Sequence, residues 1–164
     1  MDPISVEALL VGIGLSESFV ASLKLAALGR LMLAALLGAL VGLERERAGK
    51  PAGLRTTVLI CVGATMFTEL SLQFARLAVG SDDGLRADPA RLAAQIIPGI
   101  GFIGAGAILH ARGRVTGLTT AATLWVVTAI GIAVGMRAYA EAIGTTLMVL
   151  GTLLLLRRFE ALLR

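Results

Sequence analysis

The side chains best suited to chemistry in this sequence are charged residues that flank long apolar stretches. One group of them is the motif Glu44-Arg45-Glu46-Arg47. Glu44 and Glu46 are two residues apart, so on a helix they point in different directions and cannot chelate one metal ion together. Glu44 and Arg47 do have the spacing of a helical ion pair. Two interpretations stay open: a charged helix end at a membrane surface, or a site completed by Arg55 from the next helix.

A second group of polar side chains opens a later apolar stretch. Asp88-Pro89 has the pattern of an N-cap residue followed by proline at the first helical position, and Arg91 and Gln95 follow at helical spacing. We therefore expect a membrane helix to begin there. Together with Glu69, these residues are the candidates for lining an ion path.

Four glycines lie close together within that stretch. They are Gly99, Gly101, Gly104 and Gly106, and they contain the pattern GxGxxG. A dinucleotide-binding loop needs a preceding strand and an acidic residue about twenty positions further on. Here the pattern lies inside an apolar block, and the next acidic residue is Glu141. The pattern therefore indicates a glycine-rich helix that neighbouring helices can approach closely.

Pro98 directly precedes these glycines. It removes a backbone donor and disfavours the helical conformation at Ile97, which predicts a broken or kinked helix. Such a break either lines an ion or substrate site or is a packing kink only. The sequence does not decide between these interpretations.

Two further glycine pairs have the spacing of membrane helix contacts. Gly38 and Gly42 lie in an earlier apolar stretch, and Gly131 and Gly135 lie in a later one. Small residues four positions apart share one helix face and let two backbones approach. We expect these faces to pack helices together, either within one chain or between the chains of a homo-oligomer.

Residues for catalysis are not apparent. Cys61 is the only cysteine and His110 the only histidine, and neither has a nucleophile, base or metal ligand within sequence reach. We therefore expect no enzyme activity and no cofactor, and magnesium stays open as a ligand. Arg30 and Glu69, each inside an apolar stretch, either reach toward the membrane surface or pair with each other.

The elements that carry these residues are long apolar stretches typical of an integral membrane protein. Of the 164 residues 57% are hydrophobic and 16% are charged, and the mean hydropathy is +0.88. Five stretches of about 18 or 19 residues match a hydrocarbon core of about 30 Å when they are α-helical. They are residues 25–43, 56–74, 92–109, 118–136 and 138–156. Because lipid offers no partners for backbone polar groups, we predict an all-α bundle of about five transmembrane helices.

The two ends of the chain are assigned separately. Residues 1–24 are predicted to form an N-terminal interfacial segment, with a sixth span as the alternative. Residues 25–156 make up the transmembrane domain, and residues 157–164 a short basic tail.

Basic residues set the expected orientation. With five spans, the Lys- and Arg-rich segments 44–55, 110–117 and 157–164 all fall on one side of the membrane. The positive-inside rule then places the N-terminus outside and the C-terminus in the cytoplasm. Since the basic residues lie in short gaps between spans, the net charge of +4 fits topology rather than nucleic acid. The expected partner is the lipid bilayer, with no nucleic acid.

Three segments together resemble the MgtC/SapB family of bacterial inner-membrane proteins. They are LGALVGLERERAGKPAGLRT (37–56), DPARLAAQIIPGIGFIGAGAIL (88–109) and VTGLTTAATLWV (115–126). Their order and spacing match as well, and the resemblance covers roughly residues 25–156. It implies a multi-pass protein of the bacterial inner membrane.

The resemblance also implies a function. It points to support of magnesium homeostasis and of growth at low magnesium by modulating other membrane proteins, with a direct channel or carrier for magnesium or another small ion as the alternative. The motif positions that it carries over are Glu44, Arg45, Glu46, Gly53, Leu54, Arg55, Asp88, Arg91, Gln95, Gly99, Gly101, Gly104, Gly106, Gly117, Thr119, Thr120 and Trp125.

The sequence departs from the family pattern in three places. Many longer members carry a soluble C-terminal domain after the last span, whereas this sequence stops at Arg164, so we expect a short form. Thr119 stands where members tied to virulence tend to have Asn, which weakens a virulence role. Pro98 replaces the small residue expected before the glycines.

Overall fold

The residues that the structure describes fold into five α-helices and a short β-hairpin. The computed structural model describes residues 17–78, 90–111 and 114–162. The elements are α2 (Glu17–Arg47), α3 (Leu54–Ala78), α4 (Ala90–Ala107), β1 (Leu109–Ala111), β2 (Arg114–Thr116), α5 (Leu118–Gly135) and α6 (Tyr139–Leu162). Each of the five predicted spans overlaps one helix. The prediction of an all-α membrane bundle is confirmed.

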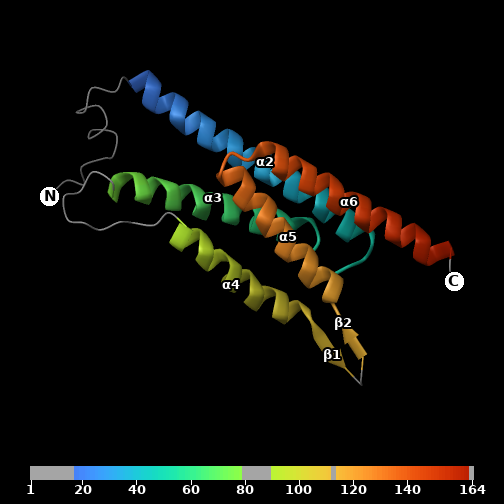
Figure 1. The fold of residues 1–164 in the computed structure, drawn as a ribbon. Coiled ribbons are helices and arrows are strands. Elements are labelled where there is room, and N and C mark those ends of the chain that lie inside the picture. The colour runs from blue at the N-terminus through green and yellow to red at the C-terminus, as the bar shows by residue number, and fades with distance from the viewer. Residues whose placement is uncertain (1–16, 79–89, 112–113, 163–164) are drawn as a thin grey trace.

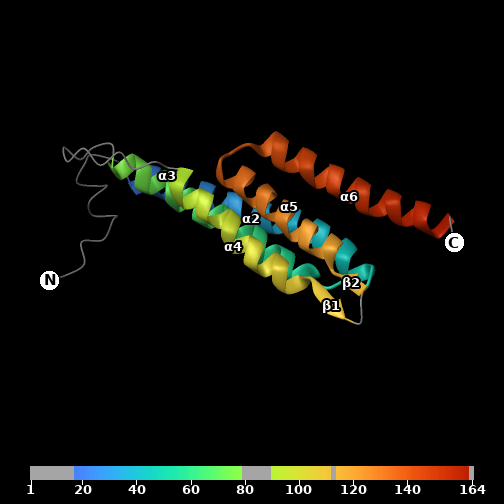
Figure 2. The same cartoon turned by 60° about the horizontal axis from the view of Figure 1, so that its bottom comes forward.

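Helix α5 occupies the centre of the bundle. It contacts each of the other four helices, and α4 and α6 lie on opposite sides of it (Figures 1 and 2). Helices α2 and α3 form the most extensive helix pair. Between α4 and α5 the chain makes the β-hairpin, in which β1 and β2 are antiparallel and His110 is opposite Val115.

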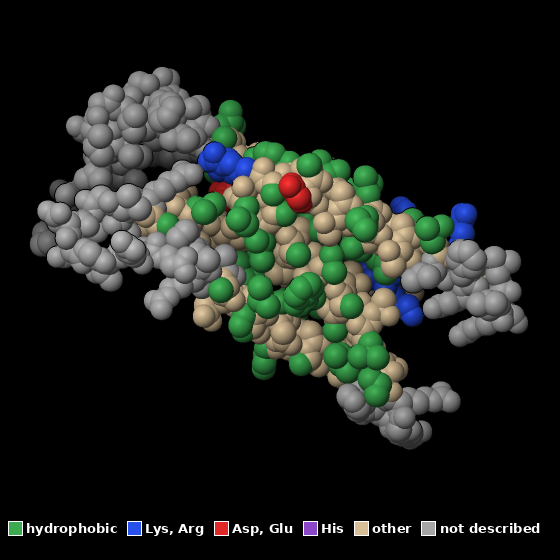
Figure 3. Space-filling view, in the orientation of Figure 1, with side chains coloured by type: hydrophobic (Ala, Val, Ile, Leu, Met, Phe, Trp, Pro, Cys, Tyr) green, Lys and Arg blue, Asp and Glu red, His purple; other side chains and the backbone are tan. Residues whose placement is uncertain are grey.

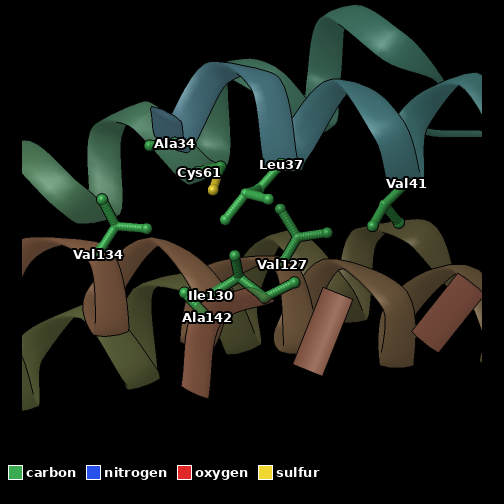
Figure 4. Close-up of a cluster of buried hydrophobic side chains, with 8 residues drawn as sticks. All are labelled: Ala34, Leu37, Val41, Cys61, Val127, Ile130, Val134 and Ala142. Atoms are coloured by element: carbon green, nitrogen blue, oxygen red, sulfur yellow. The ribbon is translucent and has the colours of Figure 1, made fainter. Parts of the chain in front are cut away.

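The buried core lies where α2, α3, α5 and α6 meet. It consists of Ala34, Leu37 and Val41 from α2, Cys61 from α3, Val127, Ile130 and Val134 from α5, and Ala142 from α6. Figure 4 shows the side chains of α2 and α5 alternating along their common axis, with Val134 near Ala34 and Val127 between Leu37 and Val41. The two helices are therefore antiparallel neighbours, and the Glu44 end of α2 continues toward the start of α5.

Two glycines bring α2 against α3. An added Cβ at Gly38 would lie 2.9 Å from the carbonyl oxygen of Thr57 and 2.9 Å from the Cβ of Cys61. One at Gly42 would lie 2.7 Å from the Cα of Leu54. Real Cβ atoms do not approach other atoms this closely, so only glycine permits this helix spacing.

Two other glycines bring α5 against α3. An added Cβ at Gly131 would lie 2.8 Å from the Cβ of Ala64, and one at Gly135 would lie 2.9 Å from the carbonyl oxygen of Thr65. The Thr65 hydroxyl donates a hydrogen bond to the carbonyl oxygen of Gly131, at 2.8 Å. Both glycine pairs noted in the sequence thus pack helices within one chain, and α3 is the helix that both pairs contact.

The surface of the bundle is apolar over its middle. Three helical segments are long and apolar enough to cross a membrane, namely Leu25–Arg47, Leu54–Ala75 and Leu118–Gly135, and Ala94–Ala107 and Tyr139–Leu155 are shorter apolar helices. On the face seen in Figure 3 Lys and Arg side chains gather toward the two ends of the molecule, with hydrophobic side chains and an acidic one between them. This distribution is that of a protein whose middle lies in lipid.

Of the broken or kinked helix predicted at Pro98, the break is not found, and the kink stays a prediction. Helix α4 is assigned without interruption from Ala90 to Ala107, with Pro98 inside it. Proline removes one helical hydrogen bond, the one to the carbonyl of Ala94. The surrounding helical bonds keep the chain helical, because an apolar environment offers the backbone no other partner.

Two features at element boundaries differ from the sequence prediction. Helix α2 begins at Glu17, so residues 17–24 are helical, whereas the segment of α2 that is apolar enough to cross a membrane begins at Leu25. Residues 1–16 lie outside the described residues, and the N-terminal interfacial segment stays a prediction there. The β-hairpin was not predicted, because strands of three residues are too short for a periodicity to be read.

Candidate functional site

The α2–α3 corner holds the charged motif at residues 44–47. Glu46 turns back toward α3, and its Oε2 accepts a hydrogen bond of 3.0 Å from the backbone N–H of Leu54, the first residue of that helix. An added Cβ at Gly53 would lie 3.0 Å from the same carboxylate oxygen. A carboxylate there satisfies a free N–H and complements the positive end of the helix dipole. Glu46 therefore caps α3, with room supplied by Gly53.

The neighbouring pair Glu44 and Arg45 is buried. The two residues are 7% and 4% exposed, and Arg45 Nε and Nη2 donate to Glu44 Oε2 at 2.6 and 2.5 Å. The other carboxylate oxygen, Glu44 Oε1, is buried and accepts no hydrogen bond from any residue that the structure describes. Glu44 thus pairs with Arg45 rather than with Arg47. It is an unusual carboxylate, since both guanidinium bonds fall on one oxygen.

Arg55 is the residue predicted to complete a site with this charged motif. It lies in the first turn of α3, is exposed, and forms no ion pair with a residue that the structure describes. No ion pair therefore links Arg55 to Glu44 among the described residues, and a shared site of the charged motif with Arg55 stays a prediction. Arg55 instead lies at the end of a groove of about 660 Å³ between α2 and α3.

Arg30 and Glu69 form an ion pair between α2 and α3. Arg30 Nε donates to Glu69 Oε1, and the two side chains are 13% and 7% exposed. Of the two options left open by the sequence, the structure shows pairing. A groove of about 220 Å³ that includes Tyr139 opens beside Arg30, and another of about 370 Å³ opens beside Glu69. Pairing lets both charges lie inside an apolar helix bundle at moderate cost.

Helix α4 borders an open apolar groove. The α3–α4 groove has a volume of about 500 Å³, and its walls include Phe67 of α3, and Gln95, Gly99 and Ile103 of α4. Gln95 is exposed in this groove and has no hydrogen bond to a residue that the structure describes. Asp88 lies outside the described residues, and so does the side chain of Arg91. Of the predicted polar group on this helix, only Gln95 is therefore placed.

The glycines of α4 are used very unevenly. An added Cβ at Gly104 would lie 3.7 Å from the Cβ of Ala121 on α5, an ordinary contact. Added Cβ atoms at Gly99, Gly101 and Gly106 would meet nothing within 4 Å. Among the residues that the structure describes, three of the four glycines therefore serve no close approach.

The start of α5 requires a glycine. Gly117, its N-cap residue, has φ 89°, and an added Cβ would collide with the carbonyl oxygen of Ala107 at the end of α4. Thr120 is buried, whereas Thr119 and Trp125 are exposed, Trp125 by 54%. Thr119 contributes through its backbone, whose carbonyl accepts a 2.7 Å hydrogen bond from the Thr123 hydroxyl. This segment of the sequence motif thus turns the chain from α4 into the central helix.

The sequence analysis did not identify the face of α3 that packs against the glycines of α2 and α5. Thr57, Cys61, Thr65 and Thr68 are all buried, and they meet the glycines of α2 and α5. Their spacing of three to four residues on one helix was a readable signal for a small, polar packing face. Among the residues that the structure describes, no group of three or more His, Cys, Asp or Glu could hold a metal ion.

A comparison with family models shows to which protein family the chain belongs. The model described as MgtC family matches residues 31–162. The chain belongs to the MgtC family. No solved structure matches it.

Named relatives within the MgtC family agree with this assignment. The chain is 45% identical over 133 residues to "Putative magnesium transporter YhiD" of Escherichia coli K12, covering 81% of this chain and 60% of that protein. It is 42% identical over 127 residues to "Protein MgtC" of Salmonella typhimurium LT2, covering 77% and 51%. An uncharacterized protein of Haemophilus influenzae is 44% identical over 122 residues, covering 74% and 51%. The chain spans about half to three fifths of the length of these relatives.

Membership of the MgtC family together with the apolar helices establishes a membrane protein. The names of the relatives describe transport or leave activity open, and none of them names an enzyme. In this MgtC-family chain the first and third resemblance segments build the helix corners at residues 44–54 and 117–123. The second segment builds α4, whose outer face stays open.

Proposed function

We propose that this MgtC-family protein supports adaptation to low magnesium by binding and modulating other membrane proteins in the bacterial inner membrane. The observation that carries the proposal is the open surface of α4. Gly99 borders the α3–α4 groove, and Gly101 and Gly106 also meet nothing within 4 Å. A partner helix would find there the small residues and the apolar groove that membrane helices use to associate.

The energetic cost of these glycines supports the same proposal. A glycine inside a helix is less favourable than alanine by about 0.8–1 kcal/mol. In α2 and α5 the glycines offset this cost by letting α3 approach closely. Gly99, Gly101 and Gly106 have no such compensation within the chain. A helix from another membrane protein would supply it.

Gln95 adds a polar contact to this surface. Its amide is exposed in the α3–α4 groove and has no hydrogen bond to a residue that the structure describes. A side-chain amide in lipid gains when a partner helix offers a hydrogen bond, by about 0.6 to 2 kcal/mol. Gln95 would therefore favour partners with a polar side chain at the matching depth.

Site-specific photocrosslinking tests this function. A photoreactive amino acid replaces Ile103 in the α3–α4 groove, with Leu147 on the exposed face of α6 as the matched control. In membranes of cells grown at low magnesium we expect a protein adduct from position 103 and none from position 147. Equal adducts from both positions, or none from position 103, would contradict the proposal.

A substitution connects the groove to the phenotype. Gly99→Leu fills the groove, and Gly144→Leu is its control, because an added Cβ at either glycine meets nothing within 4 Å. We expect Gly99→Leu to abolish the adduct and to impair growth at low magnesium while the chain still folds. Normal growth of Gly99→Leu would remove the link between the groove and the function.

Direct ion transport is the second candidate, and the Arg30–Glu69 pair favours it. Charged side chains inside membrane segments often mark an ion or proton path, and this pair has a groove on each side. Liposomes that contain the purified chain decide between the two functions. Magnesium or proton flux above that of empty liposomes, abolished by Glu69→Gln, would establish transport. The leading proposal expects no flux from correctly folded protein.

We further propose an orientation with the N-terminus outside and the C-terminus in the cytoplasm. The α2–α3 corner, with exposed Arg47, Lys50 and Arg55, then lies on the cytoplasmic side, as the positive-inside rule requires. Cys61 is fully buried, so a new cysteine at Lys50→Cys is the reactive one for an impermeant thiol reagent. Labelling is expected in inverted vesicles and not in intact cells.

A further inference from the structure

The α2–α3 groove lies on the outer side of the α2–α3 pair and has a volume of about 660 Å³. Ala35 and Ala39 of α2 and Val58 of α3 are half-buried along it, whereas Met32 and Leu59 are 71% and 72% exposed beside them. Small side chains between large ones make a furrow between the two helices. From residue 32 to residue 39 the furrow extends roughly 10 Å along α2.

One end of this furrow carries a charge. Arg55 is the only charged residue among those that line it, lies in the first turn of α3, and is exposed. It forms no ion pair with a residue that the structure describes. An apolar furrow that ends at an unpaired guanidinium has the layout of a phospholipid, in which an acyl chain continues into a phosphate.

The charges around Arg55 favour an anion. The exposed charged residues of the corner are Glu46, Arg47, Lys50 and Arg55, three cations and one carboxylate. The carboxylate of Glu46 is engaged by the N–H of Leu54, and Glu44 and Arg45 neutralise each other in the interior. The remaining field at the membrane surface is positive, and the N-terminal end of the α3 dipole adds to it.

We propose that the α2–α3 groove is a binding site for an anionic phospholipid, with one acyl chain along Ala35 and Ala39 and the phosphate on Arg55. A guanidinium can bind a phosphate through two parallel N–H bonds, so Arg55 can recognise the phosphate by its shape as well as by its charge. The α3–α4 groove is the internal contrast. Among the residues that the structure describes, none that lines this groove is charged, so these residues would not select a lipid there by its headgroup.

Lipid binding to the full-length purified chain tests the proposal. Native mass spectrometry compares phosphatidylglycerol with phosphatidylcholine of the same acyl chains. We expect the wild-type chain to prefer phosphatidylglycerol. Arg55→Gln should weaken that binding about fivefold, which corresponds to about 1 kcal/mol per basic side chain at a membrane surface. It should weaken phosphatidylcholine less, because the choline cation offsets the charge of the same phosphate group.

Two controls separate a site from diffuse attraction. Lys50→Gln removes an equal charge from the same corner but does not line the groove, so it should change little. Ala39→Leu fills the furrow and should weaken both lipids. Equal losses for Arg55→Gln and Lys50→Gln, or no preference in the wild-type chain, would overturn the proposal. Arg55→Lys should recover part of the binding, which also guards against a folding defect.

Discussion

Two glycine-rich parts of this bundle look alike in sequence and differ completely in structure. Gly38, Gly42, Gly131 and Gly135 each bring a neighbouring helix so close that no side chain fits. In α4 only Gly104 meets a neighbour, and Gly99, Gly101 and Gly106 face open space. The first set builds the α2–α3–α5 core. The second set makes no close helix contact with the residues that the structure describes.

This difference teaches how to interpret small residues in membrane helices. Packing of α2, α3 and α5 accounts for the glycine pairs spaced four apart without any outside partner. Packing within the described chain does not account for Gly99, Gly101 and Gly106 of α4. These glycines lower helix stability, and no close contact with a described residue compensates for that loss. Helix packing within the chain explains the first set, and the proposed binding of a partner helix would explain the second.

The largest expected effect comes from the core set. Gly131→Ala would place its Cβ into contact with the carbonyl oxygen of Cys61 and 2.8 Å from the Cβ of Ala64, which forces α5 away from α3. We expect a loss of about 2–3 kcal/mol, as for overpacked cores. Thermal unfolding in detergent, followed by circular dichroism, measures it. Gly144→Ala on α6 is the control, and an unchanged unfolding temperature for Gly131→Ala would show that the α3–α5 contact is looser than described.

The Arg30–Glu69 pair gives the next largest effect. Glu69→Leu leaves Arg30 without its partner in the same α2–α3 contact, and an uncompensated charge in a membrane segment costs about 2.5 kcal/mol at the centre. Arg30 can recover part of this by reaching toward the surface, so we expect a loss of about 1–2 kcal/mol. The double variant Arg30→Leu/Glu69→Leu should regain stability. Additive losses in the double variant would mean that the pair does not couple the helices.

Sequence reasoning succeeds here where a signal is local and periodic. Each of the five apolar stretches became a helix because membrane thickness imposes a length that the sequence shows directly. Gly38 and Gly42 were recognised as a packing face, but their partner depends on which helix lies opposite. That partner, the face with Thr57 and Cys61, is a property of the assembled bundle.

The candidate site was less predictable for the same reason. Glu44 and Glu46 are two residues apart, and the sequence treats them alike. In the bundle Glu44 turns inward to Arg45 and Glu46 turns outward to the N–H of Leu54. Which carboxylate is buried depends on how α2 is rotated against its neighbours. The helix does not break at Pro98, although proline disfavours helix locally, because an apolar environment offers the backbone no hydrogen-bond partners outside the helix.

A smaller effect is expected at the α2–α3 corner. Glu46→Ala removes the acceptor for the Leu54 N–H and should cost about 1 kcal/mol, the usual value of a helix cap. Hydrogen exchange at the first turn of α3 should rise while exchange in the middle of that helix stays constant. Lys50→Ala is the matched control, because its side chain takes no part in the cap. Uniform acceleration along α3 would indicate a role for Glu46 beyond capping.

Gly101→Ala is expected to change the stability of the isolated chain least. It also tests most directly the difference between the glycines of α4 and those of the core. An added Cβ there meets nothing within 4 Å, so the methyl group improves helix propensity without a clash. We expect the unfolding free energy in detergent to stay unchanged or to rise by up to about 1 kcal/mol, opposite in sign to Gly131→Ala. In native membranes the same methyl group lies where a partner helix would approach, so the protein adduct from position 103 should weaken. A gain in stability without loss of the adduct would place the partner on another face, whereas destabilisation in detergent would show that α4 already packs through Gly101 within one chain.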